Sequence, residues 1–250
     1  MKSVQIALLV VAALVCNWCR GAEITVISTV AVQGLLEQVR TSFEHSTGNR
    51  LHVEYGTSAV LKRQLEDGGS FDVAILTQSM INDLARNGKV DSGAQAVVAR
   101  SGVGLAAKKG THKPSIVTRQ ALRRTLSGSS GIAYTKEGQS GAAAVRLFEA
   151  LGIAETMKDR IYLDTRPGGG VLAVADGKAP IGIALMSEIA ANPNVSLIGP
   201  LPGDLQSYVV FSAGAASSTK EPQACRAFIS FLGGPEVRRR LQKLGMEAGK

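Results

Sequence analysis

The sequence predicts an α/β fold with a mixed, mostly parallel sheet. Short segments rich in β-branched residues alternate with segments whose apolar residues recur at the period of a helix, and the connections are short. One apolar segment, residues 96–107, carries a single charge, Arg100, followed by Ser101 and Gly102. A charge in an apolar strand needs a partner, so Arg100 either forms an ion pair within the protein or binds an anionic ligand as a fork, through the two parallel N–H groups of its guanidinium. A strand end from which Arg100 reaches solvent is the third alternative.

The N-terminus has the composition of a signal peptide. Lys2 precedes an apolar run at residues 6–15, and small or polar residues follow as far as Gly21 and Ala22. The run is too short to span a bilayer, so a retained anchor is a weaker alternative. A lipoprotein attached at Cys16 is weaker still, because Val15 precedes it where a small residue is expected. We therefore predict that residues 1–21 are a cleaved signal peptide and that the mature protein is periplasmic.

Composition excludes several classes of protein. The 250 residues are 45% hydrophobic and 19% charged, as in an ordinary globular protein, and the formal net charge is +8. Scattered basic clusters, few aromatic residues and export argue against a nucleic-acid partner, and suggest solvated surfaces with a preference for anions. Cys225 is the only cysteine after the signal peptide, so we expect no internal disulfide and a core position for its side chain.

The first part of the mature chain repeats a strand–helix unit three times. A parallel sheet follows from such repeats, and its ligands bind beyond the carboxyl ends of the strands. The expected strands are 23–28, 51–55 and 71–77, and the expected helices start at residue 30 and cover 59–66 and 78–87.

Hydroxyl residues stand where these strands end. Ser28 and Thr29 follow the first strand, and Thr57 and Ser58 follow the second. Helix starts offer free N–H groups and a favourable dipole to an anion. Ser and Thr are also the commonest helix caps, so one such residue alone would indicate only a cap. Two pairs at one sheet edge indicate an anion site.

The second part continues the alternation of strands and helices. Ser140 and Gly141 open a third helix after a strand, and a glycine-rich turn at 165–170 contains Arg166. The turn lacks the spacing of a phosphate loop or a dinucleotide fingerprint, so an anion cup and a flexible turn both stay open. Strands are expected at 131–134, 161–164, 180–185, 195–199 and 207–213, and helices at 115–126, 142–151, 171–176, from 186, at 221–232 and at 235–244.

Three segments together resemble the type II periplasmic solute-binding proteins, in particular relatives of the molybdate-binding receptors of ABC importers. They are GTSA at 56–59, FDVAILT at 71–77 and ARSG at 99–102. The resemblance extends from residue 23 to the C-terminus. It implies a monomer that delivers a small anionic ligand to a membrane permease. It also implies two α/β lobes around a ligand cleft, with lobe 1 at 22–101 plus 207–250 and lobe 2 at 102–206.

Carried over residue by residue, the match to the molybdate site is partial. A ligand-binding serine of the family falls on Ser58, and another falls on Val30, next to two hydroxyl residues. Ser140 replaces a small residue that donates its N–H. Pro167, which has no N–H, and Leu185 stand at two further ligand positions. The resemblance therefore leaves the identity of the anion open between a molybdate-type oxyanion and an organic carboxylate, which would gain from Arg forks.

Two functions from different classes follow. The favoured one is a receptor that closes on a small anion, with neutral donors and the charge of Arg100, and without metal, cofactor or catalytic residue. The alternative is a periplasmic isomerase acting on a tricarboxylate, because the ARSG crossover also resembles periplasmic aconitate isomerase; its base would be Tyr134, Lys136 or Glu137. The predicted ligand-binding residues are Ser28, Thr29, Ser58, Arg100, Ser101, Tyr134, Ser140, Gly141 and Arg166.

Overall fold

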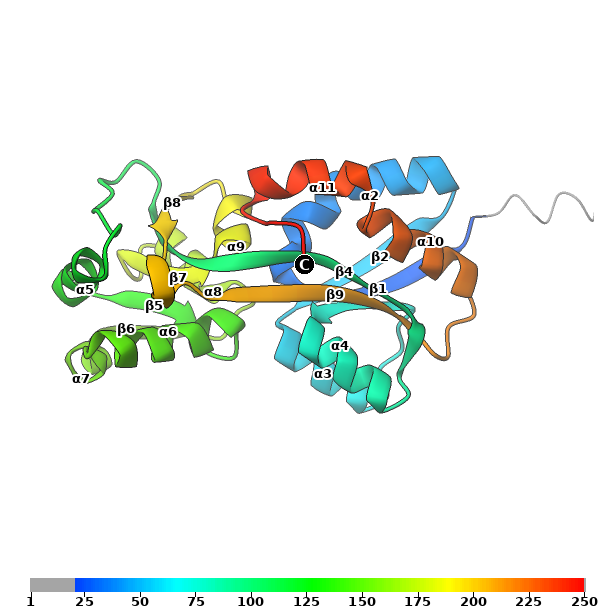
Figure 1. Cartoon of the computed structure of the whole chain (residues 1–250), viewed down its shortest axis with the longest axis horizontal. Coiled ribbons are helices and arrows are strands. Elements are labelled where there is room, and N and C mark those ends of the chain that lie inside the picture. Colours follow the sequence, from blue (N-terminus) through cyan, green and yellow to red (C-terminus); the bar gives the residue numbers. More distant parts are fainter. Residues whose placement is uncertain (1–20, 250) are drawn as a thin grey trace, which may run out of the picture.

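A computed structural model describes residues 21–249 (Figure 1). The predicted signal peptide, including its lipoprotein alternative at Cys16, lies outside the described residues except for Gly21. Within residues 21–249, no helix is both long and apolar enough to cross a membrane. The mixed α/β architecture predicted from the sequence is confirmed, and its strands form two sheets that share one long strand.

The first sheet, sheet A, contains four strands that run in one direction and a single strand that runs against them. Strands β1 (Glu23–Thr29), β2 (Arg50–Gly56) and β3 (Val73–Thr77) are parallel, with β1 in the middle. Strand β9 (Tyr208–Ala216) runs antiparallel between β3 and the first part of β4 (Val90–Lys108). The carboxyl ends of β1 and β2 therefore lie at one edge of sheet A.

Helices cover both faces of sheet A (Figure 1). Their apolar stripes bury against the strands, and Phe43 and Phe228 stack with ring centroids 4.9 Å apart on one face. One face carries η2 (Val30–Val32), α2 (Gln33–Thr47), α10 (Pro222–Leu232), α11 (Pro235–Leu241) and η5 (Gln242–Leu244), and the other carries α3 (Ser58–Glu66) and α4 (Gln78–Arg86).

The second sheet, sheet B, has the same mixed character. Strands β5 (Ile132–Thr135), β6 (Ile161–Asp164) and β7 (Ile181–Leu185) are parallel, and the second part of β4 runs antiparallel to β7 and to β8 (Val195–Pro200). Its helical segments are α5 (Arg119–Gly128), α6 (Gln139–Leu151), α7 (Ala154–Met157), η3 (Lys158–Arg160), α8 (Gly169–Ala175), α9 (Met186–Ala191) and η4 (Gly203–Leu205).

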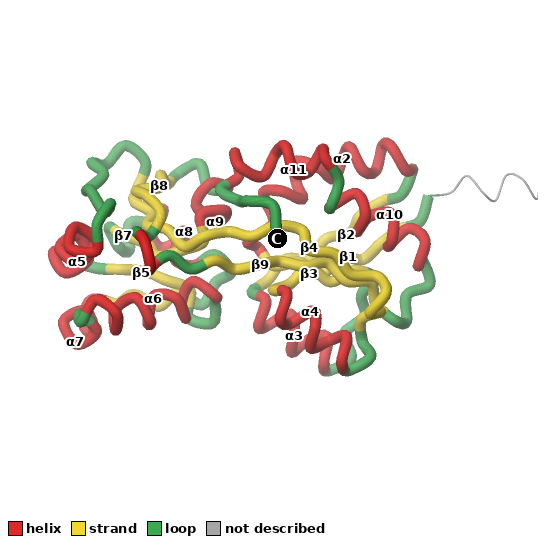
Figure 2. The backbone as a smooth tube through the Cα atoms, viewed as in Figure 1, coloured by secondary structure: helices red, strands yellow, loops and turns green. Residues whose placement is uncertain are grey.

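Strand β4 changes partner between two adjacent residues. Gly102 pairs with Tyr208 of β9, whereas Val103 pairs with Leu185 of β7. Figure 2 shows β4 and β9 as the two strands that run from one half of the molecule to the other. The proposed lobe boundaries, 22–101 plus 207–250 and 102–206, remain a prediction, and the change of partner falls beside the first of them.

Several helices begin elsewhere than the sequence indicates: α2 begins at Gln33 instead of residue 30, α8 begins at Gly169 instead of residue 171, and two others differ by three or four residues. The helix expected from residue 115 begins at Arg119, because the Thr118 hydroxyl accepts a hydrogen bond from the Ala121 N–H and so sets the start. The helix expected from residue 142 begins at Gln139, with Gly138 as its N-cap. Ser140 and Gly141 therefore lie inside its first turn.

Candidate functional site

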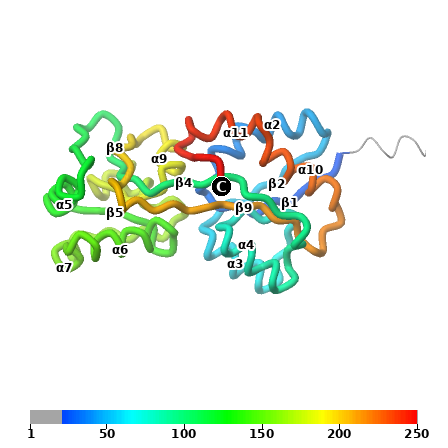
Figure 3. Tube along the Cα trace, viewed as in Figure 1, coloured from blue at the N-terminus to red at the C-terminus, as the bar shows by residue number. Residues whose placement is uncertain are grey.

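Five strand-to-helix junctions, from both sheets, surround one cavity of about 350 Å³ that includes space open to solvent. The early and the middle parts of the chain meet there, as the sequence colouring of Figure 3 shows. The carboxyl ends of parallel strands bring helix starts to the same place, which explains why residues so distant in sequence converge. The lining residues are Thr29, Val30, Ala31, Thr57, Ser58, Ala59, Thr135, Glu137, Gly138, Gln139, Gly168, Leu185, Glu188 and Phe211.

Two hydroxyl groups of the lining have no partner. The side chains of Thr57 and Ser58 are buried, at 8% and 5% exposure, and within the described part of the chain neither Oγ atom makes a hydrogen bond. Thr57 is the N-cap of α3, yet its side chain forms no capping bond. A buried hydroxyl without a partner costs about 1–3 kcal/mol. Oxygen atoms of a ligand in the cavity would remove that cost.

Three further helix starts around the cavity also lack side-chain caps. Thr29 before η2, Gly138 before α6 and Gly168 before α8 make no capping bond through a side chain. The backbone N–H groups and the helix dipoles at these starts favour negative charge. Together with the two free hydroxyls, they form a set of neutral donors suited to an anion.

The only charged residues that line the cavity, within residues 21–249, are two glutamates. Glu137 pairs with Arg63 of α3 at 2.7 Å, and that hydrogen bond lowers the pKa of its carboxyl. The pair joins a residue of the sheet A side to one of the sheet B side. Glu188, in the first turn of α9, accepts a hydrogen bond from the Leu185 N–H at 3.3 Å, and burial raises the pKa of its carboxyl to about 7.

The structure places two of the predicted ligand-binding residues, Thr29 and Ser58, in the lining of this cavity. Ser28 is fully buried just behind it, and its Oγ donates to the carbonyl of Thr29 at 3.3 Å. Ser140 and Gly141 are buried in the first turn of α6, beside the lining residue Gln139.

Arg100 and Ser101 do not line the cavity. The Arg100 Nε atom lies 2.9 Å from Oε2 of Glu247, and its guanidinium lies 4.5 Å from the ring centre of Tyr208. The Ser101 Oγ donates to the Gly245 carbonyl at 3.0 Å and accepts from the Ser187 N–H at 3.1 Å. Of the alternatives for Arg100, the structure contains the ion pair, and a role for Arg100 in anion binding stays a prediction.

Tyr134 and Arg166, two more of the predicted ligand-binding residues, also lie away from the cavity. The ring of Tyr134 packs against Phe148 of α6, with centroids 6.2 Å apart, on the far side of β5. Arg166 binds Asp164 and Asp176 at 2.7 and 2.8 Å, and the bond to Arg166 lowers the pKa of the Asp164 carboxyl. The glycine-rich turn is therefore held by ion pairs, and only Gly168 of the turn reaches the cavity.

Three polar residues of the lining, Thr135, Gln139 and Glu188, have no sequence signal that marks them as ligand-binding. Thr57 belongs to one of the hydroxyl pairs expected at the sheet edge, but it resembles an ordinary cap until the absence of a capping bond is known. The Thr135 Oγ accepts from the Gly170 N–H at 3.3 Å and so ties β5 to α8. Glu188 has the pattern of a carboxylate at the third position of a helix, which normally caps that helix. Only the packing around it reveals its place in the cavity.

Comparison with known proteins identifies the family of this chain. Residues 24–247 match the family model of bacterial extracellular solute-binding proteins. Aconitate isomerase from a Pseudomonas species is 24% identical over 90% of this chain and 87% of its own, and the molybdate-binding protein ModA of Azotobacter vinelandii is 23% identical over 87% of both. A solved structure of an Azotobacter vinelandii periplasmic molybdate-binding protein superposes with a TM-score of 0.78 at 21% identity, over 91% of this chain and all of that one.

The chain therefore has the fold of a type II solute-binding protein and a cavity suited to a small ligand. It belongs to the family of bacterial extracellular solute-binding proteins, and its relatives include molybdate-binding proteins.

Variants of Arg100 and of its partner Glu247 distinguish a structural ion pair from a role of Arg100 in anion binding. Because the ion pair is partly exposed, Arg100→Ala and Glu247→Ala are each expected to lower the free energy of unfolding by about 1 kcal/mol or less. Neither should change anion affinity more than about twofold, since neither residue lines the cavity. Chemical denaturation and a binding titration of both variants provide the measurement. A large loss of affinity in Arg100→Ala, with Glu247→Ala unchanged, would instead establish Arg100 as an anion fork.

Proposed function

We propose that this protein is the periplasmic substrate-binding component of an ABC importer and that it closes on a small anion. The observation that carries the proposal is the pair of buried hydroxyls, Thr57 and Ser58, without partners in a cavity surrounded by helix starts. The family supports a ligand-binding role, and its members work with membrane permeases.

The donor set supports an anion bound through neutral groups. No Lys, Arg or His side chain lines the cavity within the described residues. Hydroxyls and backbone N–H groups can bind a compact oxyanion without a counter-charge, because each contributes a charge-assisted hydrogen bond. A molybdate-type oxyanion and a small carboxylate both satisfy this chemistry. Closure of the two lobes around the ligand, about the strands that join them, is the expected movement.

A second candidate is an isomerase that moves a proton on a tricarboxylate. Its support is Glu188, whose carboxyl titrates near neutral pH in the cavity, as a general base should, together with the relative that is named an aconitate isomerase. The receptor is favoured because, among residues 21–249, no cationic side chain lines the cavity to bind three carboxylates.

A thermal-shift screen of the chain from residue 22 tests the proposal. The panel contains molybdate, tungstate, sulfate, phosphate, citrate, isocitrate and both aconitates. A thousandfold excess over the Kd stabilises the folded state by about 4 kcal/mol, which corresponds to a rise in Tm of roughly 10 °C for a chain of this size. No shift with any anion would reject the receptor. Conversion of one aconitate isomer into the other, followed by NMR, would favour the isomerase instead.

A further inference from the structure

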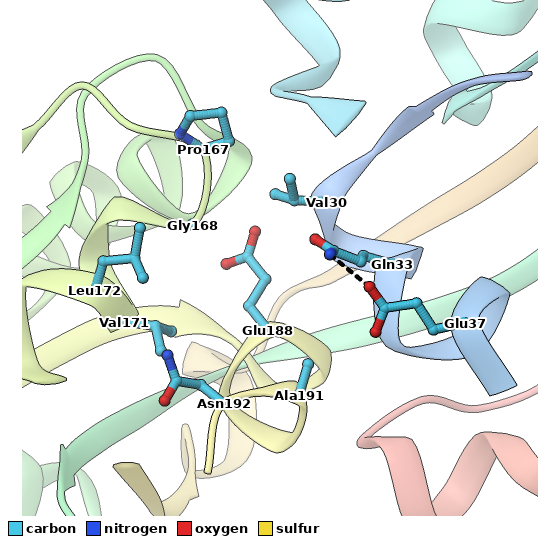
Figure 4. A pocket seen from close by; sticks show the side chains of 10 residues that line it. All are labelled: Val30, Gln33, Glu37, Pro167, Gly168, Val171, Leu172, Glu188, Ala191 and Asn192. Atoms are coloured by element: carbon cyan, nitrogen blue, oxygen red, sulfur yellow. Dashed lines mark hydrogen bonds between the residues drawn. The ribbon is translucent and has the colours of Figure 1, made fainter. Parts of the chain in front are cut away.

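Glu188 lies where two cavities meet. It lines the cavity described above and also an outer cavity of about 540 Å³ between α2 and the α8–α9 region. Val30 and Gly168 are the other residues common to both linings, so the two spaces adjoin at these three residues. Figure 4 shows the Glu188 carboxyl pointing away from its helix, into the space between Val30 and the segment from Pro167 to Leu172. A ligand in the inner cavity therefore lies close to this carboxyl group.

The surroundings of Glu188 offer little to stabilise its ionised form. Its one hydrogen bond within residues 21–249 comes from the Leu185 N–H. Glu37, the other carboxylate that lines the outer cavity, accepts a hydrogen bond from the Gln33 side chain at 2.7 Å. Burial raises the pKa of Glu188 to about 7, and no basic side chain contributes to that shift. The elements packed against α9 carry these titratable side chains: Glu37, Arg40, Glu44 and His45 on α2, Asp91, Arg100 and Lys108 on β4, and Lys243 on η5.

An anion in the inner cavity makes the ionised carboxylate still less favourable. Like charges in one desolvated site repel, and one of the two groups must then hold a proton. Neither Thr57 nor Ser58 can offset a second negative charge, because hydroxyls are neutral donors. A protonated Glu188 removes the repulsion and supplies one more hydrogen bond to the anion.

We propose that Glu188 is a specificity-determining residue that binds the anion through a shared proton, so that the complex contains one proton between its carboxyl and a ligand oxygen. The inference rests on the proposed function of the cavity. With a fully ionised anion, the proton comes from solvent and is taken up on binding. With a ligand that carries its own proton, such as hydrogen phosphate, the ligand supplies it. The site therefore favours a protonated anion at alkaline pH.

The sign of the pH dependence follows from this arrangement. Below pH 7 the Glu188 carboxyl is already mostly protonated in the ligand-free protein, so binding requires no further protonation. Above pH 7 each bound anion must first have a proton placed on Glu188, so affinity falls by up to about tenfold per pH unit. A carboxylate that only capped α9 would leave the affinity for a fully ionised anion independent of pH in this range.

Titration calorimetry with molybdate, sulfate and trans-aconitate tests the inference, since all three are fully ionised above pH 7. For each probe that binds, we expect the Kd of the parent protein to rise by about fivefold from pH 7 to pH 8. Experiments in two buffers of different ionisation enthalpy should detect uptake of nearly one proton at pH 8. Glu188→Gln keeps a hydrogen-bond acceptor for the Leu185 N–H. In this variant the Kd should change less than twofold from pH 7 to pH 8, and proton uptake on binding should vanish.

Glu37→Gln is the matched control. It removes a carboxylate of the outer cavity only, so the pH dependence of the parent should remain. A pH-independent Kd in the parent protein, or an unchanged slope in a folded Glu188→Gln, overturns the inference and leaves the anion receptor intact. If none of the three probes binds even at pH 6, the proposed anion site itself fails, and the inference fails with it.

Discussion

The double variant Thr57→Val, Ser58→Ala is expected to lose most of its anion affinity and at the same time to gain stability without ligand. Each hydroxyl is a buried donor, and removing both should cost about 2–4 kcal/mol of binding, or roughly 30- to 1000-fold in Kd. The free protein no longer buries two unpartnered hydroxyls, so its Tm should rise. Thermal unfolding with and without ligand measures both effects in one experiment.

Ser212 provides the control for this experiment. Its Oγ is also buried without a partner in the described part of the chain, but it lies in β9 and does not line the cavity. Ser212→Ala should raise the Tm of the free protein and leave the Kd unchanged. A double variant that binds as tightly as the parent would mean that Thr57 and Ser58 serve only the start of α3.

Gly141→Ala is expected to destabilise the fold and to weaken binding together. A methyl group on Gly141 would lie 2.3 Å from the carbonyl oxygen of Thr135, which is backbone and cannot turn away. The start of α6 must then shift from the end of β5, at a cost of about 1–3 kcal/mol in the free energy of unfolding. The same shift moves the N–H groups of α6 away from the cavity. Denaturant unfolding and a binding titration measure the two losses.

The matched substitution is Gly128→Ala at the end of α5. No atom lies within 4 Å of the added methyl group there, so stability should stay the same or rise by up to about 1 kcal/mol. Affinity should not change, because α5 contributes no residue to the cavity. A Gly141→Ala protein as stable as the parent would show that the start of α6 accommodates the methyl group.

Most elements of the fold could be predicted from the sequence because they depend on local patterns. The strand at 161–164 has the predicted bounds, and α10 and α4 end within one residue of theirs. The start of β4 could not be predicted: residues 90–95 contain no apolar run, yet they are strand because Val90 and Gln95 pair with β9. That partner lies more than a hundred residues away in the chain.

Only the part of the site that is formed by helix starts could be predicted from the sequence. Thr29 and Ser58 follow from strand–helix junctions, and both line the cavity. Arg100 looked available for an anion because its partner, Glu247, lies in the C-terminal segment, where the sequence gives no sign of a return to β4. Glu188 could not be predicted because its local pattern indicates an ordinary cap, and only tertiary packing places it, half-buried, in the lining of the cavity.

The position of β9 in sheet A determines the order in which the fold can be completed. β9 lies between β3 and β4, although all of sheet B separates it from them in the sequence. Until residues 208–216 are in place, β3 and β4 each present an unpaired edge, and neither sheet A nor its covering helices can form a closed core. Folding therefore depends on contacts between distant parts of the chain, which makes it slow compared with folding through local contacts.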